Sequence, residues 1–329
     1  MPLDPTNTWR IVSFYSGCPL SKARVLVAAS SKTRAASLGK CVSFLPRKVD
    51  RIVGGQPVES MTNYRFLICE LGPHLRSPAR LLAALRSDAH VALILPTLDV
   101  RLIAHHMRDE RVNHLMLRSG TCEAVQSVAE KLESGAIFGL ERYLPPSVSI
   151  NYRRLRTYED RCEALEDLAR DLQERRLRGS LRRAAAQAAE ELLMNAMYQA
   201  PVDEEGNRLF RDIAPSDRIH HPTPRPVSFR FAVHGKTVYL SVRDRFGSFQ
   251  RADLHRCLSR CVRSQAQIED KKLGAGLGLY LVTSTVTKLV INIMPGRLAE
   301  FICVLDRPSQ EAAGIQLLSV TTADDGRRI

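Results

Sequence analysis

The apolar positions in the first part of the chain fall into short runs, each bounded by polar residues. These runs occupy residues 24–29, 49–53, 64–71, 90–95 and 112–117. Such runs are typical of strands that are buried on both faces of a parallel sheet. Segments suited to helices lie among them, at residues 78–87, 98–108 and 121–134. The alternation predicts a doubly wound α/β domain over residues 23–140, after a lead-in of residues 1–22 with few periodic features.

A different pattern follows residues 141–156, which contain two consecutive prolines and predict a linker. Leucines then recur at spacings of three and four, with charged residues between them. That spacing predicts a helix over residues 158–177 and a second helix over 181–199. Alternating β-branched and aromatic residues predict two hairpins after these helices, over 227–242 and 289–305.

The second predicted helix carries a carboxylate and an amide on one face. Glu191 and Asn195 are four residues apart, so their side chains project from the same side of a helix. A carboxylate can take the proton of a nucleophile, and an amide oxygen is a suitable ligand for magnesium. Most Glu-x-x-x-Asn pairs face solvent, so this pair gains meaning only together with other motifs.

Two further segments contain candidate binding residues. The first hairpin ends at Asp244, and Phe246 and Gly247 follow it. An aspartate at a strand end can accept a hydrogen bond from a ligand amine, although it also initiates turns. A stretch with two lysines and three alternate glycines comes next: Lys271, Lys272, Gly274, Gly276 and Gly278. Glycines let a backbone approach a ligand, and a helix N-terminus after them favours phosphate, although the stretch also suits a simple turn.

The net charge of +13 makes nucleic acid or an acidic protein a candidate partner. Most of the cations are arginines spread along the whole chain, and only residues 175–183 are dense in them. Leucines interrupt this segment as on an amphipathic helix, and no aromatic stacking platform lies within it. The sequence therefore favours a solvated helix face or a protein docking surface over nucleic-acid binding.

The eight cysteines are scattered and include no Cys-x-x-Cys pair. Cysteines in apolar settings, such as Cys69 and Cys303, predict reduced core residues of a cytoplasmic protein. Cys257 and Cys261 lack a second pair of ligands, so no zinc site is expected. No apolar run is long enough to span a membrane, and residues 1–10 lack a signal-peptide pattern, so no membrane partner is expected.

The first predicted domain resembles the response-regulator receiver domain in the order and spacing of its elements, which implies a flavodoxin-like fold. That family holds magnesium with an acidic pair after its first strand, where this chain has Ala29 and Ser30. The phosphoacceptor aspartate corresponds to Glu70, and the lysine after the fifth strand corresponds to Arg118. Without acidic ligands the resemblance implies a pseudo-receiver used for protein contacts. Glu70 is either a mimic of phosphoaspartate or a polar residue at a strand end.

Residues 157–308 resemble the GHKL ATPase domain shared by gyrase, heat-shock chaperones, sensor kinases and anti-sigma-factor serine kinases. The order of Glu-x-x-x-Asn-Ala, hairpin, Asp-x-x-Gly, glycine stretch and second hairpin carries the resemblance, which is closest to the anti-sigma-factor kinase branch. It implies an α/β two-layer sandwich that binds ATP and Mg2+. By this resemblance Glu191 is the catalytic or water-orienting base, Asn195 holds the magnesium, and Asp244 bonds the adenine amino group. Residues 271–278 would cover the phosphates, and 309–329 would form a C-terminal tail.

Two features depart from these family patterns. Phe246 stands where the adenine motif Asp-x-Gly-x-Gly has its first glycine, so its ring either packs beside the adenine or crowds it. No histidine lies between residues 145 and 195, where a sensor kinase carries its phosphoacceptor, so histidine autophosphorylation is not expected.

The sequence thus predicts a cytoplasmic, bacterial-type signalling protein that binds ATP and Mg2+ and acts as a serine or threonine kinase on a partner protein. One alternative is a non-catalytic regulator that nucleotide switches. Another is a nucleic-acid-associated regulator that uses residues 175–183. The identity of the partner and the formation of a homodimer stay open.

Overall fold

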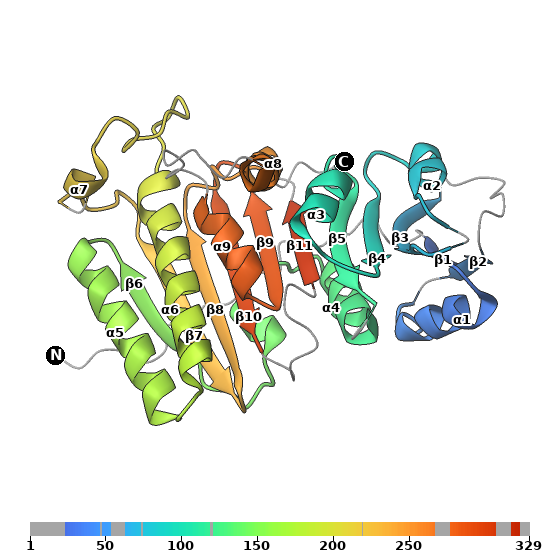
Figure 1. The fold of residues 1–329 in the computed structure, drawn as a ribbon, viewed down its shortest axis with the longest axis horizontal. Helices are drawn as coiled ribbons and strands as arrows, with labels where there is room; N and C mark the ends of the chain where they lie inside the picture. The colour runs from blue at the N-terminus through green and yellow to red at the C-terminus, as the bar shows by residue number, and fades with distance from the viewer. Residues whose placement is uncertain are drawn as a thin grey trace.

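One mixed sheet of eleven strands runs through the residues that the computed structural model describes (Figure 1). Its strand order is β2-β1-β3-β4-β5-β11-β9-β10-β8-β7-β6. The chain is therefore a mixed α/β protein, and the N-terminal part of its sheet is parallel. The described residues are 24–46, 48–53, 63–73, 75–118, 121–218, 220–266, 277–306 and 317–322.

The N-terminal half, up to residue 134, contributes five parallel strands: β1 (Arg24–Ala29), β2 (Val49–Val53), β3 (Tyr64–Glu70), β4 (His90–Leu95) and β5 (Val112–Leu117). The apolar runs predict these bounds well because helices bury the central strands from both sides. Two helices cover one face, α1 (Lys32–Cys41) and α4 (Thr121–Ser134). Two others cover the opposite face, α2 (Ala79–Ala84) and α3 (Val100–His106).

The C-terminal half contributes five antiparallel strands: β6 (Asn151–Leu155), β7 (Val227–His234), β8 (Thr237–Asp244), β9 (Lys288–Met294) and β10 (Leu298–Leu305). The helices of its main core are α5 (Tyr158–Glu174), α6 (Gly179–Met194), α8 (Arg251–Ala266) and α9 (Leu277–Thr285). A 3-10 turn, η2 (Leu140–Tyr143), packs on the other face of this sheet, and α7 (Pro215–Arg218) lies in a loop. The predicted hairpins are confirmed, and both have tight turns.

Two strands lie in segments that the sequence predicts as linker and tail. Strand β6 forms the outer edge of the sheet within 141–156, and four of its five residues are exposed, which hides any apolar alternation. Strand β11 (Leu317–Thr322) lies within 309–329 and is inserted between β5 and β9. The partners of β11 are distant in sequence, so no local pattern predicts its place. It joins the two halves into one sheet.

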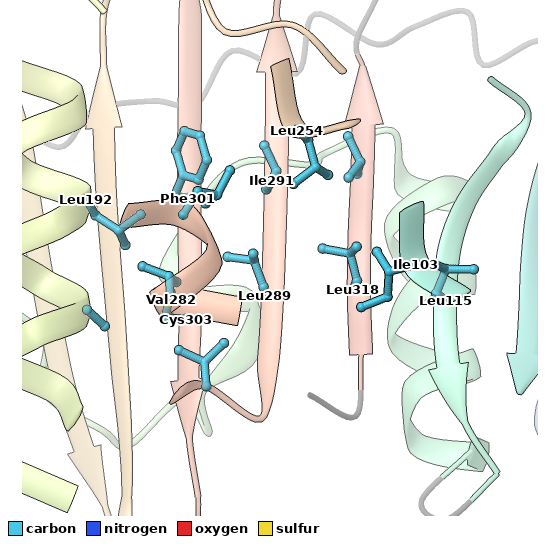
Figure 2. Close-up of a cluster of buried hydrophobic side chains, with 14 of the residues drawn as sticks. Ile103, Leu115, Leu192, Leu254, Val282, Leu289, Ile291, Phe301, Cys303 and Leu318 are labelled. Atoms are coloured by element: carbon cyan, nitrogen blue, oxygen red, sulfur yellow. The ribbon is translucent and has the colours of Figure 1, made fainter. Parts of the chain in front are cut away.

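A continuous apolar core accompanies this junction. Figure 2 shows Leu115 of β5, Leu318 of β11 and Leu289 of β9 in neighbouring strands. Val282 of α9 and Leu192 of α6 belong to the same cluster of buried side chains. Because this cluster crosses from one half to the other, burial of apolar surface stabilises the two halves together.

Three buried polar side chains meet beside β11. Lys131 Nζ on α4 donates to Ser319 Oγ on β11 at 3.3 Å, and the same hydroxyl lies 2.9 Å from Nδ1 of His114 on β5. Lys131 is only 6% exposed. Burial lowers the pKa of Lys131 to about 7, although the carboxylate of Glu300 acts in the opposite direction. Burial also holds the pKa of His114 well below its ordinary value, and the nearby Lys131 adds to this effect.

Replacing Lys131 by methionine is expected to raise the free energy of unfolding at pH 7 by about 1–2 kcal/mol, because a buried amine is exchanged for an apolar chain of similar length. In the wild type the unfolded chain binds a proton on Lys131 that the folded chain releases above about pH 7. Wild-type stability therefore rises with pH from there towards 10, and the advantage of the variant shrinks. Urea unfolding at pH 7 and 9.5 measures this. Lys40→Met, on the exposed side of α1, is the control. A less stable Lys131→Met protein at pH 7 would contradict the expectation.

The expectation of reduced cysteines is wrong for one pair. Cys69 and Cys303 are buried free thiols, as predicted, but Cys41 and Cys122 form a disulfide between α1 and α4. Their Cα atoms are 5.4 Å apart, within the range a disulfide needs, because both helices pack on the same face of the sheet. In the described part of the chain, no helix is long and apolar enough to cross a membrane.

Candidate functional site

The C-terminal end of α6 carries Glu191 and Asn195, both partly buried. Small and apolar residues recur at helical spacing along this helix and bury it against the sheet. The α-helix ends at Met194, and a π-helical turn, η3 (Asn195–Gln199), continues it. Within this turn the amide of Ala200 donates to the carbonyl of Asn195 at 2.8 Å. Such turns are rare and often occur at functional sites, and here one begins at the predicted magnesium ligand.

The carboxylate of Glu191 lies against the first turn of α9. A Cβ atom placed on Gly278 would come within 2.1 Å of Oε2 and 3.0 Å of Cδ of Glu191. Two residues that are far apart in sequence are therefore in direct contact, and a Cβ at position 278 would displace the carboxylate of Glu191. Burial raises the pKa of Glu191, and the neighbouring Glu190 raises it further. A carboxylate with a raised pKa is suited to accept a proton.

Arg161 on α5 forms an ion pair with Glu190, the residue before Glu191 on α6. Its Nη1 donates to Oε1 of Glu190 at 2.7 Å, and its guanidinium lies 4.8 Å from the ring centre of Tyr158. Arg161 is almost fully buried, so this ion pair fixes the side chain of Glu190 more firmly than an exposed pair would. The arrangement leaves Glu191, and not Glu190, beside α9.

Asp244 ends strand β8 and is 2% exposed. Its Oδ1 accepts hydrogen bonds from the amides of Phe246 at 2.8 Å and Gly247 at 3.0 Å. No donor to Oδ2 occurs among the residues that the structure describes. Burial raises the pKa of Asp244 to about 6, although hydrogen bonds from the amides of Phe246, Gly247 and Asp244 itself oppose this shift. Oδ1 thus shapes the turn, while Oδ2 accepts no hydrogen bond from another described residue.

Position 247 needs a glycine because the backbone between β9 and β10 packs directly against it. Its φ is +59°, and a Cβ there would lie 2.3 Å from the carbonyl oxygen of Met294 and 2.5 Å from the amide nitrogen of Leu298. Its carbonyl also accepts from the amide of Gly296 in the turn between β9 and β10. The glycine therefore lets two backbone segments approach closely, which fixes the turn after Asp244.

Phe246 is 3% exposed, and Arg225 lies over its ring with Cζ 5.2 Å from the ring centre. Arg225 is held there because its Nη1 donates to the carbonyl of Arg245 at 2.8 Å. Phe246 is therefore packed under a guanidinium rather than exposed at the surface. The hydroxyl of Ser248 next along the turn donates to the carbonyl of Ala200 at 2.7 Å, which ties the turn to the end of η3.

These parts meet on one face of the sheet. Asp244 has the same parity along β8 as Leu240 and Val242, which belong to the core under the helices. Helix α6 packs on β8 and on α9, and η3 also packs on β8. The face thus gathers the buried carboxylate of Asp244, the amide of Asn195 at a π-turn, and the carboxylate of Glu191 beside the first turn of α9. Such a set can bind a polar ring, a hard cation and an anion.

Four predicted binding residues, Lys271, Lys272, Gly274 and Gly276, lie outside the described residues. Three residues of the site, Arg161, Arg225 and Ser248, are absent from the sequence prediction. The first two are single arginines in a chain rich in arginine, and Ser248 follows an ordinary turn, so no local signal marks them.

The N-terminal half has a separate charged cluster at the carboxyl ends of its strands. Glu70 is 1% exposed and pairs with Nη2 of Arg34 at 3.0 Å and with Nε of Arg118 at 2.9 Å. Arg118 Nη2 also donates to the carbonyl of Leu71 at 3.1 Å. Glu70 is therefore more than a solvated polar residue at a strand end. Within the described part of the chain, no group of three or more His, Cys, Asp or Glu residues could hold a metal ion.

No family model matches this chain, and no curated protein matches it. Among solved structures, those of S. aureus homoserine dehydrogenase at pH 6.0 and pH 8.5 are similar to it at 8% and 7% sequence identity. The matches cover 91% of this chain and 99% and 98% of those chains, with a TM-score of 0.18 for both. A TM-score this low supports no conclusion about fold or function.

Proposed function

We propose that the chain binds ATP with magnesium at the face formed by α6, β8 and α9, as the resemblance to GHKL domains implies. The observation that carries the proposal is the contact between Glu191 and Gly278, since it joins two motifs that are separate in sequence. Asp244, the third motif, lies on the same face of the sheet. Three motifs in the family order would not converge in this way by their local patterns alone.

The chemistry of the residues fits the parts of the ligand. Oδ2 of Asp244, which is not used in the turn, would accept a hydrogen bond from the adenine amino group. The side-chain oxygen of Asn195 would hold Mg2+, which keeps the remaining positions for water and phosphate oxygens. The first turn of α9 at Gly278 would face the phosphates, whose charge an N-terminal helix turn favours. When bound, the magnesium would neutralise the charge that develops on the phosphates.

Glu191 would make the site a kinase acting on a serine or threonine of a partner protein. It would take the proton of the partner hydroxyl while the oxygen of that hydroxyl bonds to the γ-phosphorus and ADP leaves. The raised pKa of Glu191 supports this role, since a base must hold the proton that it accepts. Hydrolysis would follow the same course with water in place of the hydroxyl.

The N-terminal half would serve protein contacts. Its strand order β2-β1-β3-β4-β5 is that of flavodoxin-like folds, to which receivers belong, and supports the proposed pseudo-receiver. Arg34 and Arg118 already neutralise Glu70, which leaves little reason for a cation to bind beside it. A partner of acidic character fits the net charge of the chain.

A non-catalytic regulator is the second candidate, and Phe246 is the observation that favours it. Its buried ring replaces a family glycine next to the proposed adenine position. A ring packed beside the adenine would slow the release of nucleotide, which suits a switch better than rapid turnover. Transfer of labelled γ-phosphate to a partner or to water separates the two functions.

Isothermal calorimetry with ATP, with and without Mg2+, tests the proposal on the full chain. The wild type is expected to bind ATP in the micromolar range in the presence of Mg2+. Asn195→Ala is expected to lose most of the magnesium-dependent gain, about tenfold in affinity, because one metal ligand is removed. Asn207→Ala, in an exposed loop, is the matched control. Absence of ATP binding by the wild type would refute the proposed function.

A further inference from the structure

We infer that Arg251 is a positioning residue through which the N-terminal half holds the helices of the nucleotide site, an inference that rests on the proposed function. Arg251 is the first residue of α8. It does not belong to any of the sequence motifs, although it follows Asp244 by seven residues. Its contacts cross from one half of the chain to the other.

The guanidinium of Arg251 is inserted into the corner between α3 and β5. Its Nη2 donates to the carbonyl oxygens of Met107 at 3.2 Å and Asp109 at 2.9 Å, and also to that of Val112. Burial lowers the pKa of Arg251 to about 10, while Glu110 and Asp109 oppose the shift. The two hydrogens of Nη2 serve these three carbonyls, while Nε and Nη1 are buried without a hydrogen-bond partner among the described residues. The contact is charge-assisted, and such hydrogen bonds exceed neutral ones.

The corner that receives Arg251 is itself held in place. Arg111 Nη2 pairs with Asp109 at 2.7 Å, and its Nη1 donates to the carbonyl of Leu85 at 3.2 Å on the chain after α2. Arg251 therefore fastens α8 to a braced segment of the N-terminal half. Helices α3 and α8 also pack directly against each other.

Helix α8 packs on α9, so the position of α8 affects the position of α9 beside Glu191. Leu254 of α8 and Val282 of α9 are buried in one cluster with Leu192 of α6, as Figure 2 shows. The first turn of α9 holds Gly278 against Glu191. A shift of α8 would move α9, and the tight contact at Gly278 would pass this movement to the carboxylate. The N-terminal half and the nucleotide site are thus coupled, and such coupling is reciprocal.

A pair of matched variants on the same helix tests the inference. Arg251→Met removes every donor to the α3–β5 corner. Arg256→Met makes the same substitution at a side chain that is 61% exposed and pairs with Asp253. In the full chain without nucleotide, Arg251→Met is expected to speed hydrogen exchange in residues 277–285 by about tenfold, whereas Arg256→Met leaves it unchanged. Arg251→Met is also expected to weaken binding of ATP and Mg2+ by about tenfold.

The reciprocal measurement separates positioning from general destabilisation. In the wild type, ATP and Mg2+ are expected to slow hydrogen exchange in residues 107–112, and this effect should vanish in Arg251→Met. Wild-type exchange in α9 and wild-type affinity in a folded Arg251→Met protein would overturn the inference. If the wild type does not bind ATP, the proposed function fails, while exchange in α9 still decides the role of Arg251. Should Arg251→Met not fold, Arg251→Lys keeps the charge but has a different donor geometry, and it is expected to show the same changes at smaller size.

Discussion

Asp244→Asn is expected to weaken ATP binding about a hundredfold without unfolding the protein. Asparagine has the same shape, and its side-chain oxygen can still accept from the amides of Phe246 and Gly247. The second oxygen becomes an NH2 group that faces the adenine amine as donor against donor. A hydrogen bond to a charged group contributes about 1.5–3 kcal/mol, and its loss together with the new repulsion gives a factor of about a hundred.

The stability of the Asp244→Asn protein provides an internal check. The folded-state pKa of Asp244 is raised to about 6, so the ionised carboxylate is disfavoured by folding above that pH. The neutral amide removes this cost, and the variant should be at least as stable as the wild type at pH 7. The stability advantage of the variant should shrink as the pH falls from 6 towards 4. In this range the folded wild type binds a proton on Asp244 and the unfolded chain does not, so the wild type becomes more stable.

Two further measurements make the Asp244 prediction specific to adenine. GTP presents an acceptor where ATP presents an amine, so Asp244→Asn should not weaken GTP binding. Wild-type affinity for ATP should fall as the pH drops through about 6, since the ionised carboxylate is the better acceptor. The phosphates of ATP titrate equally with both proteins, so the difference between the two pH profiles reports Asp244. Equal ATP affinity of variant and wild type would exclude Asp244 from the adenine contact.

The sequence predicts the elements that have a local hydrophobic pattern, and it misses the features that depend on tertiary contacts. Strands β1, β3, β4 and β5 are predicted almost to the residue because burial on both faces makes them largely apolar. Strand β6 is an exposed edge without apolar alternation, and the place of β11 in the sheet depends on pairing with strands that are distant in sequence. The same holds for the disulfide of Cys41 and Cys122, which depends on how two helices pack.

In the candidate site, too, some features follow from local sequence patterns and others depend on tertiary contacts. The spacing of Glu191 and Asn195 follows from helical periodicity, and Asp244 at a strand end follows from the hairpin pattern. The π-turn at Asn195 does not follow, because it depends on one extra residue being accommodated between α6 and the turn after β8. The contact of Gly278 with Glu191 requires α9 to pack on α6, which only the tertiary structure reveals.

The continuous sheet changes how the two predicted modules are expected to work. A receiver-like domain on a linker would act on a nucleotide domain only through transient contacts. Here β11 pairs with both β5 and β9, and Arg251 fastens α8 to the α3–β5 corner. The proposed partner of the N-terminal half would therefore bind a half that shares its sheet and core with the helix that carries Glu191. Regulation by such a partner needs no rearrangement of a linker.

Gly278→Ala is expected to lower the rate of phosphate transfer or hydrolysis about a hundredfold while changing ATP affinity much less. The new Cβ would lie 2.1 Å from Oε2 of Glu191, so the carboxylate must move away from its position beside α9. A general base contributes roughly 10²–10⁴ in rate, and displacement of about 1 Å can remove much of this. The helix itself should gain, because alanine is favoured over glycine in a helix by about 1 kcal/mol. Thermal melting checks that the fold is kept.

A double-mutant cycle shows whether the glycine acts through Glu191. Glu191→Ala shortens the side chain and removes the atoms with which a Cβ at position 278 would collide. Adding Gly278→Ala to Glu191→Ala should therefore cost nothing more, and the two substitutions should be strongly non-additive in single-turnover rates. Additive losses would mean that Gly278 acts on the phosphates and not on the carboxylate. A Gly278→Ala protein with the wild-type rate would remove Glu191 from the chemical step, because its observed position would then be irrelevant to turnover.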